Sequence, residues 1–132
     1  MPFIRRSRLA ALALLGAACL SANAAPTPAT VRAEIEALLG RITASGCQFE
    51  RNRSWHSGDD ARAHLLRKLK HIEGRPETVT STEQFIEFAA SKSSFSGRPY
   101  RVRCGNGDPV ESRAWLHREL KALRAADTRA KQ

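Results

Sequence analysis

The chain has 132 residues, and its 22 lysines and arginines outnumber its 13 aspartates and glutamates, for a formal net charge of +9. This length supports one domain with a modest core rather than several domains. Acidic and basic residues are interleaved, which favours a solvated basic surface over a nucleic-acid or anionic-glycan site.

The first 24 residues have the pattern of a secretory signal peptide. Arginines near the start precede the apolar run Leu9–Leu20, and Ala22-Asn23-Ala24 fits a small-x-small cleavage site. The run is shorter than the ~20 residues that span a bilayer, and no later run is long enough. We therefore expect an exported chain that begins at Ala25. Cleavage removes three arginines and no acid, which lowers the net charge from +9 to +6.

The cysteines agree with export. Cys19 leaves with the signal peptide, and the remaining pair, Cys47 and Cys104, is expected to form a disulfide worth roughly 4 kcal/mol of stability. The pair lacks Cys-x-x-Cys spacing, which disfavours a redox-active or metal-binding role. Cleavage before Cys19 would give a lipoprotein instead, but Gly16 stands where such a site has a large aliphatic residue.

Helical spacing of apolar residues predicts a first helix that ends near Gly46. The residues are Val31, Ile35, Leu38, Leu39 and Ile42. The alternating segment Cys47–Glu50, a turn and the segment Ser54–His56 then predict a small hairpin.

A second helix is predicted after Ser57–Asp60, which supplies a cap and first-turn acids. Its apolar face contains Ala61, Leu65, Leu69 and Ile72. His64 and His71 lie at the edge of this face, near Lys68. A metal site would need a third ligand, so we interpret both as histidines packed beside the core.

A third helix is predicted from Ser81, where Gln84 completes a capping box. Residues 90–99 then form a turn, residues 100–104 a short strand, and residues 112–124 a last helix. This order predicts a small, helix-dominated α+β domain over residues 25–124. It has about four helices, a two- or three-stranded antiparallel sheet and one disulfide. Residues 125–132 contain no core residues, and we expect a flexible basic tail.

Several short motifs follow one another along the predicted mature chain. They are Ser45–Asn52, Trp55, Ala61, His64, Leu65, Lys68, Ala90–Ser94, Ser96-Gly97, Pro99-Tyr100, Val102, Cys104, Pro109-Val110, Ser112 and Trp115-Leu116. Together they resemble the YfeK-like family, small exported proteins of Gram-negative bacteria with a domain of unknown function. The resemblance implies a periplasmic address and the two-cysteine pattern, and it carries over no catalytic role. The sequence departs from the family pattern at Arg53 and His56, where a small and an aromatic residue are expected.

Lys92, Ser93 and Ser94 form the first candidate cluster. A lysine can act as the base for a serine nucleophile, and hydroxyl groups after a helix can hold an anion. The sequence has neither Ser-x-x-Lys nor a Gly-rich phosphate loop at this point. We therefore favour structural roles, with the lysine at the helix C-terminus and the serines in the turn.

The strand at residues 100–104 is the second candidate cluster. Arg101 and Arg103 project from one face of it, and Glu50 of the hairpin is placed to neutralise one of them. Tyr100 lies on the other face. With Trp55 and Trp115 it would form an aromatic binding surface beside the two arginines, and the alternative is that both tryptophans pack in the core.

We therefore expect a non-catalytic periplasmic binding or accessory domain. Arg101, Arg103 and the turn at residues 90–97 would hold an anionic ligand or a protein of the cell envelope. The alternative is a small hydrolase or transferase that uses Ser93 or Ser94 with Lys92 or a histidine. A third interpretation is a structural envelope component. No motif calls for a metal or a cofactor.

Overall fold

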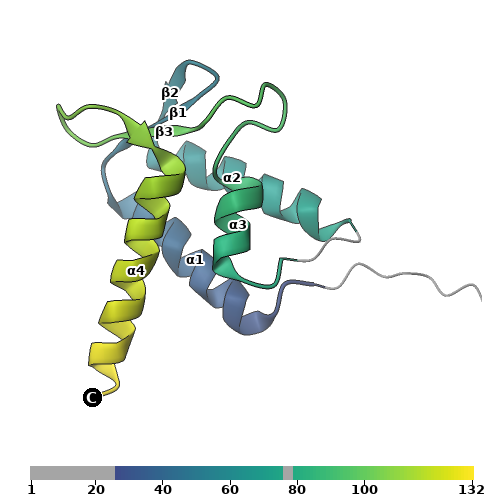
Figure 1. Cartoon of the computed structure of the whole chain (residues 1–132), viewed down its shortest axis with the longest axis vertical. Helices are drawn as coiled ribbons and strands as arrows, with labels where there is room; N and C mark the ends of the chain where they lie inside the picture. Colours follow the sequence, from purple (N-terminus) through teal and green to yellow (C-terminus); the bar gives the residue numbers. More distant parts are fainter. Residues whose placement is uncertain (1–25, 76–78) are drawn as a thin grey trace, which may run out of the picture.

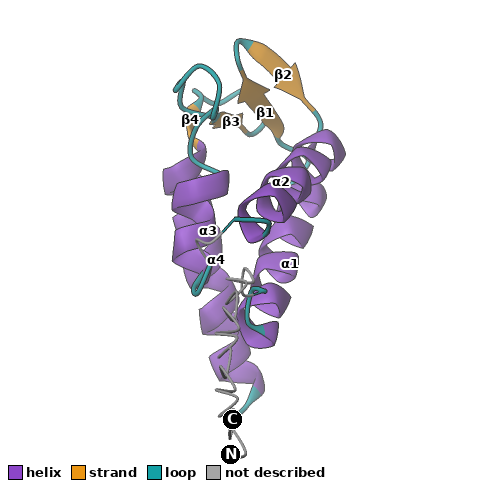
Figure 2. Ribbon diagram, turned by 90° about the vertical axis from the view of Figure 1, so that its right-hand side faces the viewer, coloured by secondary structure: helices purple, strands orange, loops and turns teal. Residues whose placement is uncertain are grey.

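The computed structural model describes residues 26–75 and 79–132, so the predicted signal peptide and both of its cleavage options lie outside the described residues. In chain order the elements are α1 (Ala29–Ala44), β1 (Gln48–Arg51), β2 (Ser54–His56), α2 (Gly58–Glu73), α3 (Thr82–Ala89), β3 (Arg101–Arg103), β4 (Val110–Glu111) and α4 (Ser112–Ala130). The helices pack against one another, and the small sheet lies at one end of them (Figures 1 and 2). The predicted α+β class is confirmed.

The sheet is antiparallel, with the order β2-β1-β3-β4. Phe49 of β1 lies between His56 of β2 and Val102 of β3. The sequence predicts two or three strands, and the structure corrects this number, because Val110 pairs with Val102 and adds β4. Two residues after Pro109 are too few to show the alternation by which a strand is recognised.

Cys47 and Cys104 form the predicted disulfide, with their Cα atoms 4.3 Å apart. Because Gln48 pairs with Arg103, the cysteines occupy the next position along β1 and β3. The bond closes a loop with a sequence separation of 57. This loop contains β1, β2, α2, α3 and β3.

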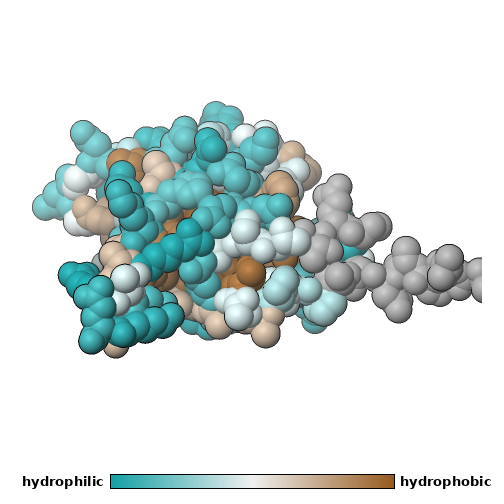
Figure 3. Space-filling model, turned by 60° about the horizontal axis from the view of Figure 1, so that its bottom comes forward, coloured by the Kyte–Doolittle hydropathy of each residue, from teal (hydrophilic) through white to brown (hydrophobic). Residues whose placement is uncertain are grey.

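The core lies between the helices and beneath the sheet. The predicted stripe of α1 is buried, and Ile35 and Leu38 have 0% of their surface exposed. Leu69 of α2 and Phe85 of α3 pack into the same core and are also 0% exposed. The helical end of the molecule, opposite the sheet, is mostly hydrophilic (Figure 3). Burial thus selects the helical faces that the sequence pattern predicts.

Two helices meet through backbone atoms at Gly58, the first residue of α2. A Cβ atom there would lie 2.6 Å from the carbonyl oxygen of Ile42 and 3.2 Å from the Cα of Thr43. A side chain at this position would therefore push α1 and α2 apart. A Cβ atom on Gly40, in the middle of α1, would meet nothing within 4 Å.

Helix α3 begins with the predicted cap, in modified form. The Ser81 Oγ accepts from the Gln84 backbone N–H at 3.1 Å. In a capping box the Gln84 side chain would accept a hydrogen bond from the Ser81 backbone N–H. Here its Oε1 accepts from the Thr80 N–H instead, at 2.7 Å. The cap therefore extends one residue further towards the N-terminus.

Helix α4 continues to Ala130, and every side chain after Leu123 is exposed. Arg124 pairs with Glu34 of α1 and Glu83 of α3, so one guanidinium joins three helices. The flexibility predicted for residues 125–132 stays a prediction. Across the described ranges, we find no helix with the length and apolar character that a membrane span requires.

Candidate functional site

The two arginines of β3 differ in their contacts. The guanidinium of Arg103 lies over the Trp55 ring, 4.3 Å from its centroid, and donates to Gln48 Oε1 at 2.7 Å. Arg101 Nη1 lies 4.0 Å from Glu50 Oε1, the residue expected to neutralise it. Arg103 is therefore held against the sheet, while Arg101 keeps a weak, half-exposed ion pair.

The serine and lysine cluster forms a closed turn. Ser93 is buried, and its Oγ accepts from the backbone N–H groups of Phe95 and Ser96, both at 3.2 Å. Lys92 and Ser94 are exposed. The hydroxyl of Ser93 thus has a structural role in the turn, as the sequence pattern favours.

Tyr100, predicted as a ligand contact, is 6% exposed and belongs to a polar network whose other members, His64 and Lys68, are partly buried. Its Oη lies 3.0 Å from His64 Nε2 and 3.1 Å from Lys68 Nζ. Lys68 Nζ also donates to the Lys92 carbonyl oxygen at 2.8 Å. Because an ammonium only donates, the phenol proton of Tyr100 has His64 Nε2 as its acceptor. His64 is then neutral, with its proton on Nδ1.

The ionisation of this network is shifted in a consistent direction. Burial, followed by the positive charge of Arg51, lowers the pKa of His64 to about 4 and that of Lys68 to about 8. Burial also raises the pKa of Tyr100. Tyr100 and His64 are consequently neutral at pH 7, and the local charge comes from Lys68 and Arg51.

A half-open cavity of 190 Å³ lies between α2 and the β1–β2 hairpin, which sits directly over α2 in Figure 1. Its apolar lining consists of Ile42, Phe49, Ala61, Ala63, Leu65, Ala90 and Leu116. Tyr100 and His64 bring this polar network to the cavity wall. An apolar cavity with a few converging polar groups is the usual form of a small-molecule site.

The charged side chains of the cavity are not equally neutralised. Glu50 faces Arg101, and Asp60 lies in the first turn of α2, where the helix N-terminus favours a carboxylate. Arg51 and Arg67 also line the cavity, and neither has a carboxylate within 4.0 Å among the described residues. Arg51 is only partly exposed, so its unpaired charge faces the cavity network.

Comparison with known proteins identifies the family. Residues 29–124, which include every residue of the cavity, match a family described as "Family of unknown function (DUF5329)". The chain belongs to the DUF5329 family. It is also 36% identical over 80 residues to "Uncharacterized protein YfeK" of Salmonella typhimurium (strain LT2). The aligned part is 57% of this chain, and the chain spans 64% of the length of that relative. The predicted resemblance is confirmed. No solved structure matches.

The match gives this DUF5329 member no assigned reaction. His71 Nε2 contacts Arg75 at 2.7 Å and His117 Nε2 contacts Glu87 at 3.2 Å, while His64 contacts Tyr100. The described residues contain no group of three or more potential metal ligands among His, Cys, Asp and Glu side chains. The alternative of a serine hydrolase or transferase stays a prediction.

Sequence reasoning missed the cavity and its main cation. His64 and Lys68 are recognised as neighbours from their i, i+4 spacing, but the sequence does not reveal that Tyr100 lies between their polar groups. The sequence pattern places Arg51 in the turn of the hairpin and indicates no role for it. Its position at the cavity depends on how the hairpin packs over α2, which is a long-range contact.

Proposed function

We propose that this protein is a non-catalytic binding domain of the bacterial periplasm, and that the cavity over α2 binds a small anion that carries an apolar group. The observation that carries the proposal is the unpaired, partly exposed Arg51 at the wall of a mainly apolar cavity. The two carboxylates of the lining, Glu50 and Asp60, lie beside Arg101 and in the first turn of α2. The sequence analysis expects an anion at the face of β3, and the proposal places the anion in the cavity instead.

The size of the cavity limits the ligand. Its volume of 190 Å³ is slightly above the ~150 Å³ of an engineered protein cavity that holds benzene, and below the ~300 Å³ at which drug-sized pockets begin. The apolar part of the ligand would therefore be about one ring or a short aliphatic chain.

The charge at the cavity favours an anion. A guanidinium donates two parallel hydrogen bonds to a carboxylate, and it is easier to desolvate than an ammonium. Lys68, whose charged form is disfavoured by burial behind Tyr100, adds positive potential that an anion would relieve. A small carboxylate with an apolar group satisfies both parts of the site.

The periplasmic address is supported by two features of the chain. The N-terminal 24 residues have the signal-peptide pattern, and Cys47 and Cys104 are disulfide-bonded. Fractionation of cells that express the full sequence, with mass spectrometry of the purified N-terminus, tests this part separately from ligand binding.

Benzoate is the probe for the cavity, and benzamide is its uncharged counterpart. At 100 times its dissociation constant benzoate adds about 2.7 kcal/mol, which raises the thermal midpoint of a domain this size by several degrees. We expect benzamide to have no comparable effect. The Arg51→Gln variant should lose the benzoate shift, and Ala63→Phe should lose it without a change in charge.

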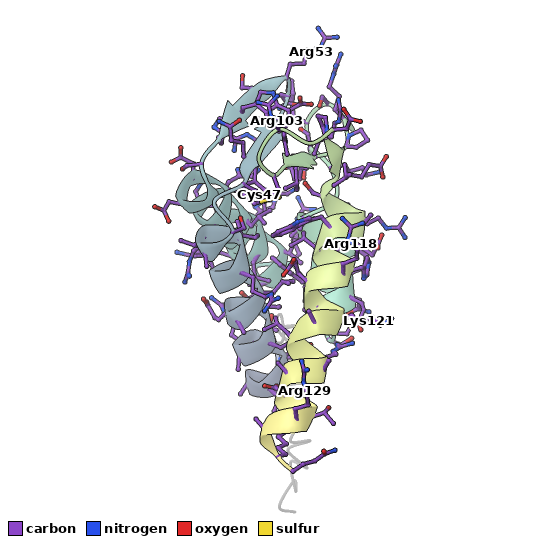
Figure 4. The ribbon with its side chains drawn as sticks, turned by 90° about the vertical axis from the view of Figure 1, so that its left-hand side faces the viewer. Cys47, Arg53, Arg103, Arg118, Lys121 and Arg129 are labelled. Atoms are coloured by element: carbon purple, nitrogen blue, oxygen red, sulfur yellow. A yellow bond between two sulfur atoms is a disulfide. The ribbon has the colours of Figure 1, made fainter. Side chains whose placement is uncertain are left out.

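Arg118→Gln is the matched control, because it removes one exposed cation from α4, far from the hairpin (Figure 4). It should keep the full benzoate shift. Equal shifts in Arg51→Gln and wild type would contradict the proposed site. If benzoate and short aliphatic carboxylates all leave the midpoint unchanged, the small-anion function is wrong.

A further inference from the structure

A second surface lies at the end of the molecule that carries the sheet. It consists of the β1–β2 turn with Arg53 and the loop Ser93–Arg98 with Phe95, and we call it the basic aromatic tip. The two segments touch, because Ser96 Oγ donates to Asn52 Oδ1 at 2.6 Å. Figure 1 shows both protruding from the same end of the fold.

Phe95 is solvent-exposed, and it lies on a loop that is closed by hydrogen bonds. It is 97% exposed, the highest value of any large hydrophobic side chain in the described residues. Its loop is closed by two backbone hydrogen bonds of 2.9 Å, from Ser93 N to Arg98 O and from Gly97 N to Ser93 O. The Phe95 ring is therefore available to a binding partner, since it does not pack against the rest of the protein.

The turn presents Arg53 at a conformational cost. Asn52 and Arg53 have φ values of 50° and 69°, as in a type I′ turn, where glycine is the usual second residue. An arginine in this left-handed region is strained, and Figure 4 shows its side chain pointing away from the body of the protein. Arg53 is exposed and has no carboxylate within 4.0 Å in the described part.

Two further cations lie at the base of the loop that carries Phe95. Arg98 and Lys92 are exposed, and the described residues place no carboxylate within 4.0 Å of either. Lys92 is joined to the base of the loop by its β-bridge with Pro99. One protruding aromatic side chain on a surface that carries unpaired cations is an arrangement that binds at a lipid–water interface.

We propose that the basic aromatic tip docks this protein on an anionic phospholipid bilayer, with Phe95 at the boundary between headgroups and acyl chains and Arg53 and Arg98 among the phosphates. A bilayer accepts a protruding side chain without a matching pocket. A protein partner would need complementary shape over about 800 Å² of each surface, and Phe95 stands on a narrow tip. None of the residues of this surface lines the cavity, and the proposal does not depend on the ligand of the cavity.

The test is co-sedimentation of the disulfide-bonded protein, expressed from the full sequence, with phosphatidylcholine vesicles that do or do not contain phosphatidylglycerol. Binding should require phosphatidylglycerol and weaken with salt. Phe95→Ser should weaken partitioning about tenfold or more, the value of burying one Phe side chain, whereas Phe95→Leu should retain most of it. Arg53→Gly should weaken it about fivefold, as expected for one cation near the surface.

The thermal midpoint of each variant distinguishes a loss of vesicle recognition from a loss of folded structure. Because Arg53→Gly relieves the left-handed strain, it should raise the thermal midpoint while it lowers vesicle binding. Arg118→Gln, which removes the same charge from α4, should change vesicle binding less than Arg53→Gly. A retained N-terminal segment would bind vesicles regardless of Phe95, so mass spectrometry of the purified chain accompanies the assay. Unchanged binding in Phe95→Ser and Arg53→Gly, or no binding to anionic vesicles, would overturn the proposal.

Discussion

His64 makes its polar contact with Tyr100 in a partly buried position that disfavours the imidazolium form. Its pKa falls to about 4, chiefly through burial and then through the charge of Arg51. In the unfolded chain a histidine titrates near pH 6.5. Between these two values the unfolded state binds a proton that the folded state does not, so the free energy of unfolding decreases as the pH falls.

Replacing His64 by Gln should reduce this acid sensitivity. Glutamine supplies an acceptor for the Tyr100 hydroxyl and does not titrate, so the loss of stability between pH 7 and pH 5 should be smaller than in the wild type. The difference should be only a fraction of the ~1.4 kcal/mol that one pKa unit represents, because His64 is partly solvated. Guanidinium denaturation at both pH values measures it. His71→Gln, at an exposed position of the same helix, is the control. An unchanged pH dependence in His64→Gln would contradict the argument.

Single residues could be predicted only where their neighbours are local. The role of Ser93 in its own turn was favoured from the sequence because its partners, Phe95 and Ser96, are two and three positions away. Tyr100 was assigned to a ligand surface, since its partners His64 and Lys68 are 36 and 32 positions away. Arg51 was missed for the same reason.

At the scale of elements, replacing two helical glycines by alanine should change the stability in opposite directions. Gly40→Ala should stabilise the protein by about 0.5–1 kcal/mol, because it improves helix propensity and its Cβ meets nothing within 4 Å. Gly58→Ala should destabilise it by about 1–3 kcal/mol, because its Cβ would lie 2.6 Å from a backbone oxygen of α1. Thermal and denaturant unfolding of both variants measures the two effects. If Gly58→Ala proves as stable as Gly40→Ala, the close approach of α1 and α2 is wrong.

The helices were predictable because apolar residues recur at helical spacing within each of them, as in α1 and in residues 115–123 of α4. The hairpin β1–β2 was predictable from alternation around a short turn. Strand β4 was not, since it has two residues and gains its structure only by pairing with β3. The extension of α4 to Ala130 was also missed, because the last residues have no apolar pattern from which a helix is recognised.

At the scale of the whole molecule, the disulfide should account for a large share of stability. The linked cysteines have a sequence separation of 57, and in the chain-entropy view such a bond stabilises the fold by about 4 kcal/mol. The whole free energy of unfolding of a typical domain is ~5–15 kcal/mol. We expect a Cys47→Ala/Cys104→Ala variant to lose about this amount in guanidinium denaturation. Wild-type protein unfolded in the presence of dithiothreitol should give the same curve. A loss below about 1 kcal/mol would show that residual structure in the unfolded chain already restrains the loop.

The order of the sheet has a consequence for crowded solutions. Its outer strands are β2, with three residues, and β4, with two. Strands this short offer few free backbone groups to a neighbouring molecule, so they are poor templates for strand-to-strand aggregation. The pairing of β1 with β3 lies inside the sheet, where both strands already have a neighbour on each side. A protein built in this way can accumulate to high concentration, with its sheet protected from joining that of another copy.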